Sequence, residues 1–263
     1  MKKIEEDLDT KLFGKNEKYS LTTAGQLLND RGSEIVQNFD RLVSEVRELG
    51  EDKNEILRLV VTILLAVQYM HQISQFIAKL QHVDLHFIQD GSINLQKKLA
   101  NGDIDIAIAS LPNLHPNDVK FTSLETDYNG YQIAAVLPDS NPLAEKDEIE
   151  LIELKDQKFS SLTEDFMIGD FLIRRSRELK FKPNVVLEHN DLQILLHSIN
   201  ELDSVCLLPL EYKSIASIHN LKWIPLKDER SFYKVGIAER IYSVRSEVAD
   251  DFIEELQGSE IKV

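Results

Sequence analysis

The stretch VDLHFIQDGSINLQKKLANGDIDIAIAS, residues 83–110, contains one complete strand–helix–strand unit. Apolar residues have strand spacing in VDLHFIQ and DIDIAIAS, whereas SINLQKKLANG between them has helical spacing. Gly102 is expected to end this helix, because glycine readily adopts the left-handed conformation that follows many helices. A helix that joins two strands predicts that they run parallel, with a right-handed crossover. The stretch therefore predicts an α/β fold.

The same alternation continues on both sides of this unit. Residues 56–62 have the pattern of a strand, and residues 66–80 have the pattern of a helix. We expect two α/β lobes in tandem, with the last two strands returning the chain to the first lobe. The further predicted strands are 131–138, 158–163, 184–189, 204–209, 221–226 and 233–240, and the further predicted helices are 165–181, 191–201 and 246–257.

The carboxyl ends of the predicted strands are the expected place for a ligand, because open α/β sheets bind ligands there. A cleft between the two lobes would hold it. Ile63 and Leu64 follow the first strand, and their bulk leaves little room for an anion at that helix start. An anion site, a pocket for an apolar or aromatic molecule, and no pocket at all therefore remain as alternatives. The candidate ligand-binding residues at the strand ends are Thr62, Ser110, Ser160, Ser161, Thr163 and Ser204.

Composition places the chain among globular proteins. Its 263 residues are 43% hydrophobic and 29% charged, enough apolar material for a sizeable core. The net charge of −15 repels polyanions, so contact with nucleic acid requires a local basic feature. The single Cys206 excludes an internal disulfide and is typical of a reducing cytoplasm.

Membrane and secretion signals are not found in the sequence. The longest apolar run, residues 59–67, is far shorter than the about 20 residues that a membrane span needs. The N-terminal MKKIEEDLD lacks the apolar core of a signal peptide. We therefore expect a cytoplasmic protein with no membrane partner.

Catalytic motifs are also missing. The sequence has no G-x-S-x-G elbow, no phosphate-binding loop and no G-x-G-x-x-G. His82 and His86 have i, i+4 spacing, but no third metal ligand stands near them, and Cys206 lies in the apolar stretch SVCLLP. We predict no catalytic residue, no metal site and no cofactor. An enzyme with the same two-lobe fold, such as a deaminase or a lyase, is the less favoured alternative.

The first 50 residues follow a different pattern. Apolar residues recur every four positions in residues 1–13, which predicts the end of a helix, and GKNEKYS then predicts a tight basic turn. A long helix is predicted over residues 23–49. Thr22 or Thr23 can cap it, and Thr23 with Gln26 fits the spacing of a capping box.

This long helix has a narrow apolar stripe at heptad spacing. Charged side chains occupy its other faces, and the polar stretch GEDKNE, residues 50–55, follows as a linker. A narrow stripe favours a seam with a second helix over a helix that lies on its own domain, so we expect dimerisation through it. The stripe residues are Leu28, Ile35, Phe39, Leu42, Val46 and Leu49.

The order of these parts resembles that of the LysR-type transcriptional regulators. IEEDLDTKLFGKNEKYSLTTAGQLL, residues 4–28, is similar to the family's acidic helix end, Leu-Phe, basic wing and Leu-Thr-x-Ala-Gly. LANGDIDIAIAS, residues 99–110, resembles the family's Leu-x-x-Gly-x-x-Asp-x-Ala-Ile signature. Residues 141–159 resemble the segment that enters the second lobe, and SVCLLP resembles the strand before its last helix. The resemblance covers essentially the whole chain.

The resemblance implies three parts: a partial winged helix-turn-helix over residues 1–22, a linker and dimerisation helix over residues 23–50, and an effector-binding domain like a periplasmic binding protein over residues 51–263. Within the effector domain it implies lobe I at about 54–128 and 228–263, and lobe II at about 129–227.

The same resemblance implies DNA-binding residues near the start of the chain. The match begins in the second half of the family's recognition helix, so the first two helices of the reader are expected to be absent from this truncated sequence. Thr22 is expected to cap the linker helix and to donate a hydrogen bond to a phosphate. The residues that take the family's DNA-contacting places are Lys2, Lys3, Lys15, Lys18 and Thr22.

The implied function is that of a bacterial-type DNA-binding regulator controlled by a small-molecule effector of unknown identity. Its partners would be DNA and a second copy, in a homodimer or homotetramer. The effector would shift the two lobes and so change how the protomers pack on DNA. However, residues 1–50 carry 8 basic and 10 acidic side chains. A truncated ligand-binding and dimerisation module that no longer binds DNA by itself is therefore the alternative.

Overall fold

A computed structural model describes residues 2–14, 20–48, 55–80, 83–124, 129–216, 218–241 and 247–258 of the chain. The chain divides into two compact units, Met1–Asn54 and Glu55–Val263. The predicted wing residues Lys15 and Lys18 and the predicted seam residue Leu49 lie outside the described residues.

The first unit begins with the short helix α1, Lys2–Asp7. It ends six residues earlier than the predicted end at Phe13, because the Glu5 carboxylate accepts hydrogen bonds from the backbone N–H groups of Leu12 (2.8 Å) and Phe13 (3.4 Å). This contact turns the chain back along α1, so the residues after Asp7 are not helical. The turned segment buries Leu12, and Phe13 forms a β-bridge with Leu21.

The long helix is confirmed as α2, Thr23–Glu48. Thr22 is its cap, since its Oγ1 accepts a hydrogen bond from the Gly25 N–H at 3.0 Å. The alternative cap at Thr23, with its capping box to Gln26, is therefore wrong. Gly25 lies very close to the turned segment. An added Cβ would lie 2.0 Å from the Leu12 carbonyl oxygen, so any other residue there would force the backbone to shift.

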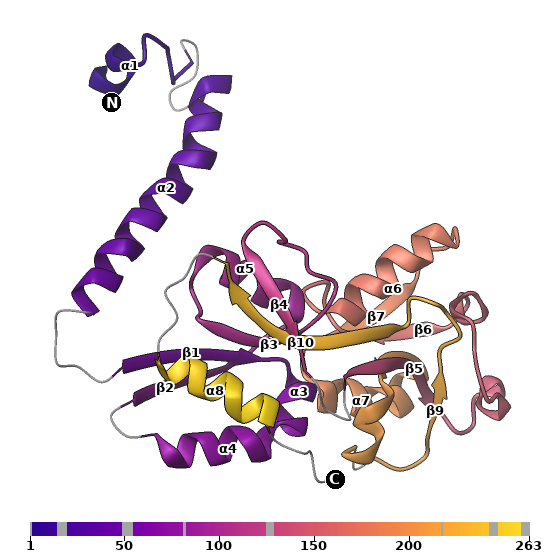
Figure 1. Cartoon of the computed structure of the whole chain (residues 1–263). Helices are drawn as coiled ribbons and strands as arrows, with labels where there is room; N and C mark the ends of the chain where they lie inside the picture. Colours follow the sequence, from indigo (N-terminus) through magenta and orange to yellow (C-terminus); the bar gives the residue numbers. More distant parts are fainter. Residues whose placement is uncertain are drawn as a thin grey trace. The chain divides into compact units, whose positions relative to one another are not determined.

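The described strands of the second unit form one sheet in the order β2-β1-β3-β10-β5-β8-β6-β7, with β4 on β10 and β9 on β5 (Figure 1). The strands are β1 Glu55–Val61, β2 Val83–Gln89, β3 Ile106–Ser110, β4 Val119–Ser123, β5 Gly130–Pro138, β6 Lys158–Ser161, β7 Asn184–Glu188, β8 Ser204–Pro209, β9 Leu221–Pro225 and β10 Phe232–Arg240.

The pairing confirms parallel strands within each half of this sheet. β2 and β3 both lie parallel to β1, which separates them, and β7 and β8 both lie parallel to β6. β10 is antiparallel and crosses between the halves: Val235–Glu239 pair with β3, whereas Phe232–Lys234 pair with β5. Among the described strands, β10 alone returns the chain to the first half. The expectation that β9 does so as well is wrong, because β9 pairs with β5 next to β8.

The helices of the second unit follow the predicted alternation, and Gly102 has the expected left-handed φ of 74° after α5. The predicted helix over residues 66–80 is instead two helices, because the backbone breaks at the buried Tyr69. The helices are α3 Ile63–Gln68, α4 Met70–Lys79, α5 Ser92–Asn101, α6 Met167–Glu178, α7 Leu192–Leu202 and α8 Glu247–Gly258, with 3₁₀ turns η1 Pro142–Glu145, η2 Leu151–Leu154 and η3 Leu210–Ser214.

Helices cover both faces of the parallel strands in the first half (Figure 1). Leu57, Leu59 and Val61 point to the core that includes α4 and α8, where the rings of Phe76 and Phe252 meet edge to face at 5.0 Å. Val60 between them points to the opposite core, which α5 closes. This alternation fixes the register of β1, because a slip by one residue would exchange the two faces. Among the described residues, no helix is long and apolar enough to cross a membrane.

Candidate functional site

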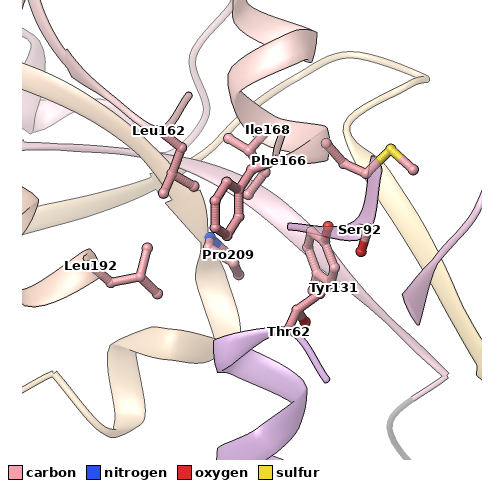
Figure 2. Close-up of a pocket in the computed structure, with 9 residues that line it drawn as sticks. Thr62, Ser92, Tyr131, Leu162, Phe166, Ile168, Leu192 and Pro209 are labelled. Carbon is pink, nitrogen blue, oxygen red and sulfur yellow. The ribbon is translucent and has the colours of Figure 1, made fainter. Parts of the chain in front are cut away.

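One pocket of the second unit lies at the carboxyl ends of the parallel strands. Thr62 follows β1 and Pro209 ends β8, while Ser92 begins α5. Tyr131 comes from β5, the strand that β10 joins to the first half. Figure 2 shows these side chains around a common space. The residues that line it are Thr62, Ser92, Tyr131, Leu162, Phe166, Met167, Ile168, Leu192 and Pro209.

The pocket is small and mostly apolar. Its volume is about 30 Å³, close to the share of a single water molecule in the liquid. Only Thr62, Ser92 and Tyr131 bring polar side-chain atoms to the lining, and none of the nine lining residues carries a positive or negative charge. A drug-sized ligand needs roughly ten times this volume or more, so a ligand enters only if lining side chains move.

Hydroxyl groups form a chain at one wall of the pocket. The Ser92 Oγ accepts from the Ser110 N–H at 3.0 Å and donates to the Ser110 Oγ at 3.2 Å. The Ser110 Oγ lies 3.0 Å from the Tyr131 hydroxyl oxygen. Burial raises the pKa of Tyr131, so its phenol stays neutral at physiological pH. The wall is therefore a neutral donor and acceptor surface.

The two halves meet beside this wall. The Ile93 N–H of α5 donates to the Asp165 carbonyl oxygen at 3.1 Å, and the Tyr233 hydroxyl donates to the Met167 carbonyl oxygen at 3.4 Å. An added Cβ on Gly91 would lie 2.3 Å from the same Asp165 oxygen. These contacts hold the loop before α6 against α5, which keeps the pocket closed.

The predicted ligand-binding hydroxyls are only partly brought together. Thr62 lines the pocket, and its Oγ1 makes no cap hydrogen bond to α3. Ser110 lies one hydrogen bond behind the lining, at Tyr131. The Val61–Ile108 pair of β1 and β3 brings these two strand ends to the same edge of the sheet.

The other predicted hydroxyls lie outside the lining. Ser160 and Ser204 stand on the adjacent strands β6 and β8, and their Oγ atoms are 2.8 Å apart, with the Ser198 hydroxyl donating to Ser160 at 2.8 Å. The Ser161 hydroxyl donates to the Leu162 carbonyl at 2.8 Å. Thr163 donates to the Asn190 side-chain oxygen at 2.7 Å. These four hydroxyls bond to protein atoms and are not among the lining residues of this pocket.

Most of the lining was not predicted, because the candidate residues were polar residues at strand ends. Phe166, Met167 and Ile168 come from the start of α6, and Leu192 comes from the start of α7. A signal existed: in a parallel sheet, the first turn of the following helix stands at the same edge as the strand end. Applied to these helices, that rule finds apolar side chains.

Cys206 confirms its predicted place in the core of β8. Its side chain is fully buried, and burial raises the pKa of the thiol, so the reactive thiolate is disfavoured. Among the described residues, no three His, Cys, Asp or Glu side chains are grouped in a way that could hold a metal ion.

The predicted DNA-contacting residues lie in the first unit. The side chain of Lys3 is exposed, whereas that of Lys2 lies outside the described side chains. The Thr22 hydroxyl accepts from Gly25 and donates its one hydrogen to the Lys11 carbonyl oxygen at 2.7 Å. A phosphate accepts hydrogen bonds only, so Thr22 reaches one only by giving up its bond to Lys11.

The predicted seam is exposed where its side chains are described. The exposed fractions of Leu28, Ile35 and Phe39 are 41%, 67% and 62%. The side chains of Leu42 and Val46 lie outside the described ones. Exposure of large apolar groups along one stripe is typical of a surface that a partner covers.

Two α/β halves joined by the crossing strand β10, with a pocket at the strand ends, have the fold of the periplasmic-binding-protein type. The family model described as the LysR substrate binding domain matches residues 50–259, and the chain belongs to the LysR family.

The sequence identity to individual relatives is low. The chain is 26% identical over 163 residues to the HTH-type transcriptional regulator YtlI of Bacillus subtilis, which covers 60% of this chain and 50% of YtlI. The chain thus spans about half the length of this curated relative.

Two solved structures show the same fold. A full-length BenM variant is 18% identical with a TM-score of 0.63, covering 98% of this chain and 84% of BenM. The effector binding domain of QuiR in complex with shikimate is 16% identical with a TM-score of 0.62, covering 78% of this chain and 97% of that domain.

Proposed function

We propose that this chain is a LysR-type DNA-binding transcriptional regulator whose second unit senses a small-molecule effector. The pocket at the strand ends is the single observation that carries this proposal, because it lies where the two halves of the sheet meet. A ligand there contacts α5 of one half and α6 of the other, so its binding free energy depends on the position of the two halves relative to each other. Such a ligand can shift the population of lobe arrangements and hence the packing of protomers.

The second part of the proposal is that α2 pairs with α2 of a second copy. Ile35→Asp or Phe39→Asp places a charge in the exposed stripe and should convert dimers to monomers, because a buried unpaired charge is costly. Thr23→Asp on the same helix is the matched control, since Thr23 is exposed and lies off the stripe. Light scattering at tens of micromolar measures the mass. A wild-type monomer at that concentration contradicts this part of the proposal.

The third part is that residues 2–22 contribute to DNA contact. Selection from a mixed-sequence duplex pool at about 50 mM salt, where electrostatic contacts are strong, should enrich specific sequences. Lys3→Ala should weaken retention of the enriched duplex and lower its salt dependence. Lys97→Ala on α5, an exposed lysine of the second unit, should leave retention unchanged.

A second candidate function is a ligand-binding and dimerising module that does not hold DNA by itself. The slight acidic excess of residues 1–50 and the engaged hydroxyl of Thr22 favour it. Failure of the selection to enrich any duplex, with a wild-type dimer present, would support this candidate against the first.

A further inference from the structure

The hydroxyl groups at one wall of the pocket have more hydrogens than acceptors among themselves. Ser92, Ser110 and Tyr131 bring three hydroxyl hydrogens but only two links between their oxygens. One of these three hydrogens therefore has no acceptor among the three hydroxyl groups. If it belonged to Ser110, the middle group, a donor would be left unsatisfied inside the protein, since Ser110 is fully buried.

The Ser92 hydroxyl donates to Ser110, so the spare hydrogen belongs to the other end of this hydroxyl chain, Tyr131, which lines the pocket. Ser110 then donates to Tyr131, and the Tyr131 phenol keeps its own hydrogen. This order presents one hydrogen-bond donor to the pocket, and no described residue accepts it. The Thr62 hydroxyl, 8% exposed, adds a neutral group on the lining.

The electrostatics of this wall disfavour a negative ligand. Burial is the main cause that raises the pKa of Tyr131, and the charge of Glu211 raises it further. The Glu211 carboxylate accepts from the Gln132 N–H, with its two oxygens at 3.1 and 3.2 Å. Burial that disfavours the phenolate also disfavours a carboxylate placed beside it, because both lose contact with water. The lining offers no lysine, arginine or histidine to offset that cost.

Two backbone donors at the start of α5 are engaged. The Ile93 N–H is bonded to Asp165, and the Gly91 N–H donates to the Asp90 carboxylate at 2.8 Å. An anion at the start of α5 would have to displace these bonds. The remaining lining is apolar and suits a hydrocarbon body.

The ring of Phe166 stands among the lining side chains (Figure 2). This residue directly precedes α6 and is only partly buried, so its ring has solvent on one side. Turning the ring outward provides space of the same shape as an aromatic ring. The Phe166 ring therefore occupies the space in which a ligand would bind.

We propose that this pocket takes a small uncharged molecule with an apolar, ring-sized body and one carbonyl or ether acceptor, which the Ser92–Ser110–Tyr131 chain binds after the Phe166 ring turns out. This inference rests on the proposed effector role of the pocket and names the chemical class of the ligand. A carboxylate of similar size should bind the same site more weakly.

Three probes that share a phenyl ring test the proposal on the full chain. Acetophenone carries a carbonyl acceptor, ethylbenzene carries none, and benzoate carries a charge. In Phe166→Ala, whose lost ring leaves an apolar cavity, ligand-observed NMR titration should show acetophenone binding about tenfold tighter than ethylbenzene, the worth of one hydrogen bond. Benzoate should bind at least tenfold more weakly than acetophenone. The wild-type chain should bind acetophenone more weakly than Phe166→Ala does, because its ring must move.

Variants of the hydroxyl chain supply the decisive comparison. Tyr131→Phe removes the donor and should abolish the preference for acetophenone over ethylbenzene, whereas Ser92→Ala leaves the Tyr131 donor in place and should keep it. Ser198→Ala, which removes a hydroxyl outside the lining, should also keep it. Circular dichroism confirms that each variant is folded before titration.

Three results would overturn the inference: benzoate binding as tightly as acetophenone, an undiminished ketone preference in Tyr131→Phe, or no probe binding to either the wild type or Phe166→Ala. The proposed regulatory function fails separately. If acetophenone binds as expected but the wild-type chain remains a monomer and retains no DNA, the ligand class stands and the regulatory role does not.

Discussion

A side-chain hydroxyl can serve a ligand only when its hydrogen is not already donated within the protein. Thr22 illustrates the rule in the first unit, since its cap position was predictable but its bond to Lys11 was not. Ser160 illustrates it in the second, because Ser198 and Ser204 are its partners across chain distances of 38 and 44 residues. Sequence identifies which residues own hydroxyls, whereas tertiary contacts decide which hydroxyls are free.

The contact between Gly25 and Leu12 gives the first prediction at the scale of the residue. Gly25→Ala places a Cβ 2.0 Å from the Leu12 carbonyl oxygen, so the first unit should lose about 1–3 kcal/mol of stability. Gly32→Ala on the same helix meets only the Leu28 side chain at 3.7 Å and should gain roughly 0.5–1 kcal/mol. Thermal unfolding followed by circular dichroism measures both. Equal effects at the two glycines would show that the close approach is not made.

Glu5 gives a second prediction, on pH. The backbone hydrogen bond from Leu12 is the main cause that lowers the pKa of Glu5, and Lys11 and Phe13 contribute. A lowered pKa means that the carboxylate contributes stability above its ordinary value of 4.5, and that this is lost as the pH falls through the folded-state pKa. The Leu12 amide should therefore exchange with solvent faster below pH 4.5, relative to intrinsic rates. Glu5→Ala, which removes the acceptor, should show fast exchange at every pH.

At the scale of the element, the strands and helices that were predicted well have complete local signals. β2 matches its predicted bounds, and α5 ends at the glycine that the sequence marks. β4 was missed, since VKFTS is short and only its first residue is buried, with no clear alternation. The break between α3 and α4 was missed too, because Tyr69 carries no glycine or proline signal and its turn is set by burial of the ring.

The cap of α7 gives the prediction at this scale. The Asp191 carboxylate accepts from the backbone N–H groups of Gln193 (2.8 Å) and Ile194 (3.3 Å). Leu192, which directly follows Asp191, lines the pocket. Asp191→Ala should cost about 1 kcal/mol of unfolding free energy, whereas Asp191→Asn should cost almost nothing, because asparagine caps equally well. Urea unfolding of the three proteins measures the difference. A loss of the same size for asparagine would assign the effect to charge and not to capping.

At the scale of the whole molecule, alternation of strands and helices was enough to predict two α/β lobes, because each unit is local in sequence. The site was harder to predict. Ser92 and Phe166 come from different halves, and they meet at the pocket because β10 crosses between the halves and pairs with both β3 and β5. No local pattern marks which apolar side chains will face each other across such a crossing. The position of the pocket was therefore predictable from topology, whereas most of its lining was not.

The contact between the halves makes the last prediction. The pocket is closed where Gly91 and Ile93 meet the Asp165 carbonyl, so Gly91→Ala should force this contact apart. The segments over residues 91–95 and 163–168 should then exchange amide hydrogens faster together, although only one of them carries the substitution. Lys97→Ala, an exposed change on the same helix, should leave both segments as in the wild type. Mass spectrometry of exchange resolves the two segments. Faster exchange confined to residues 91–95 would mean that the substitution frays α5 locally and that the two halves do not move as coupled bodies.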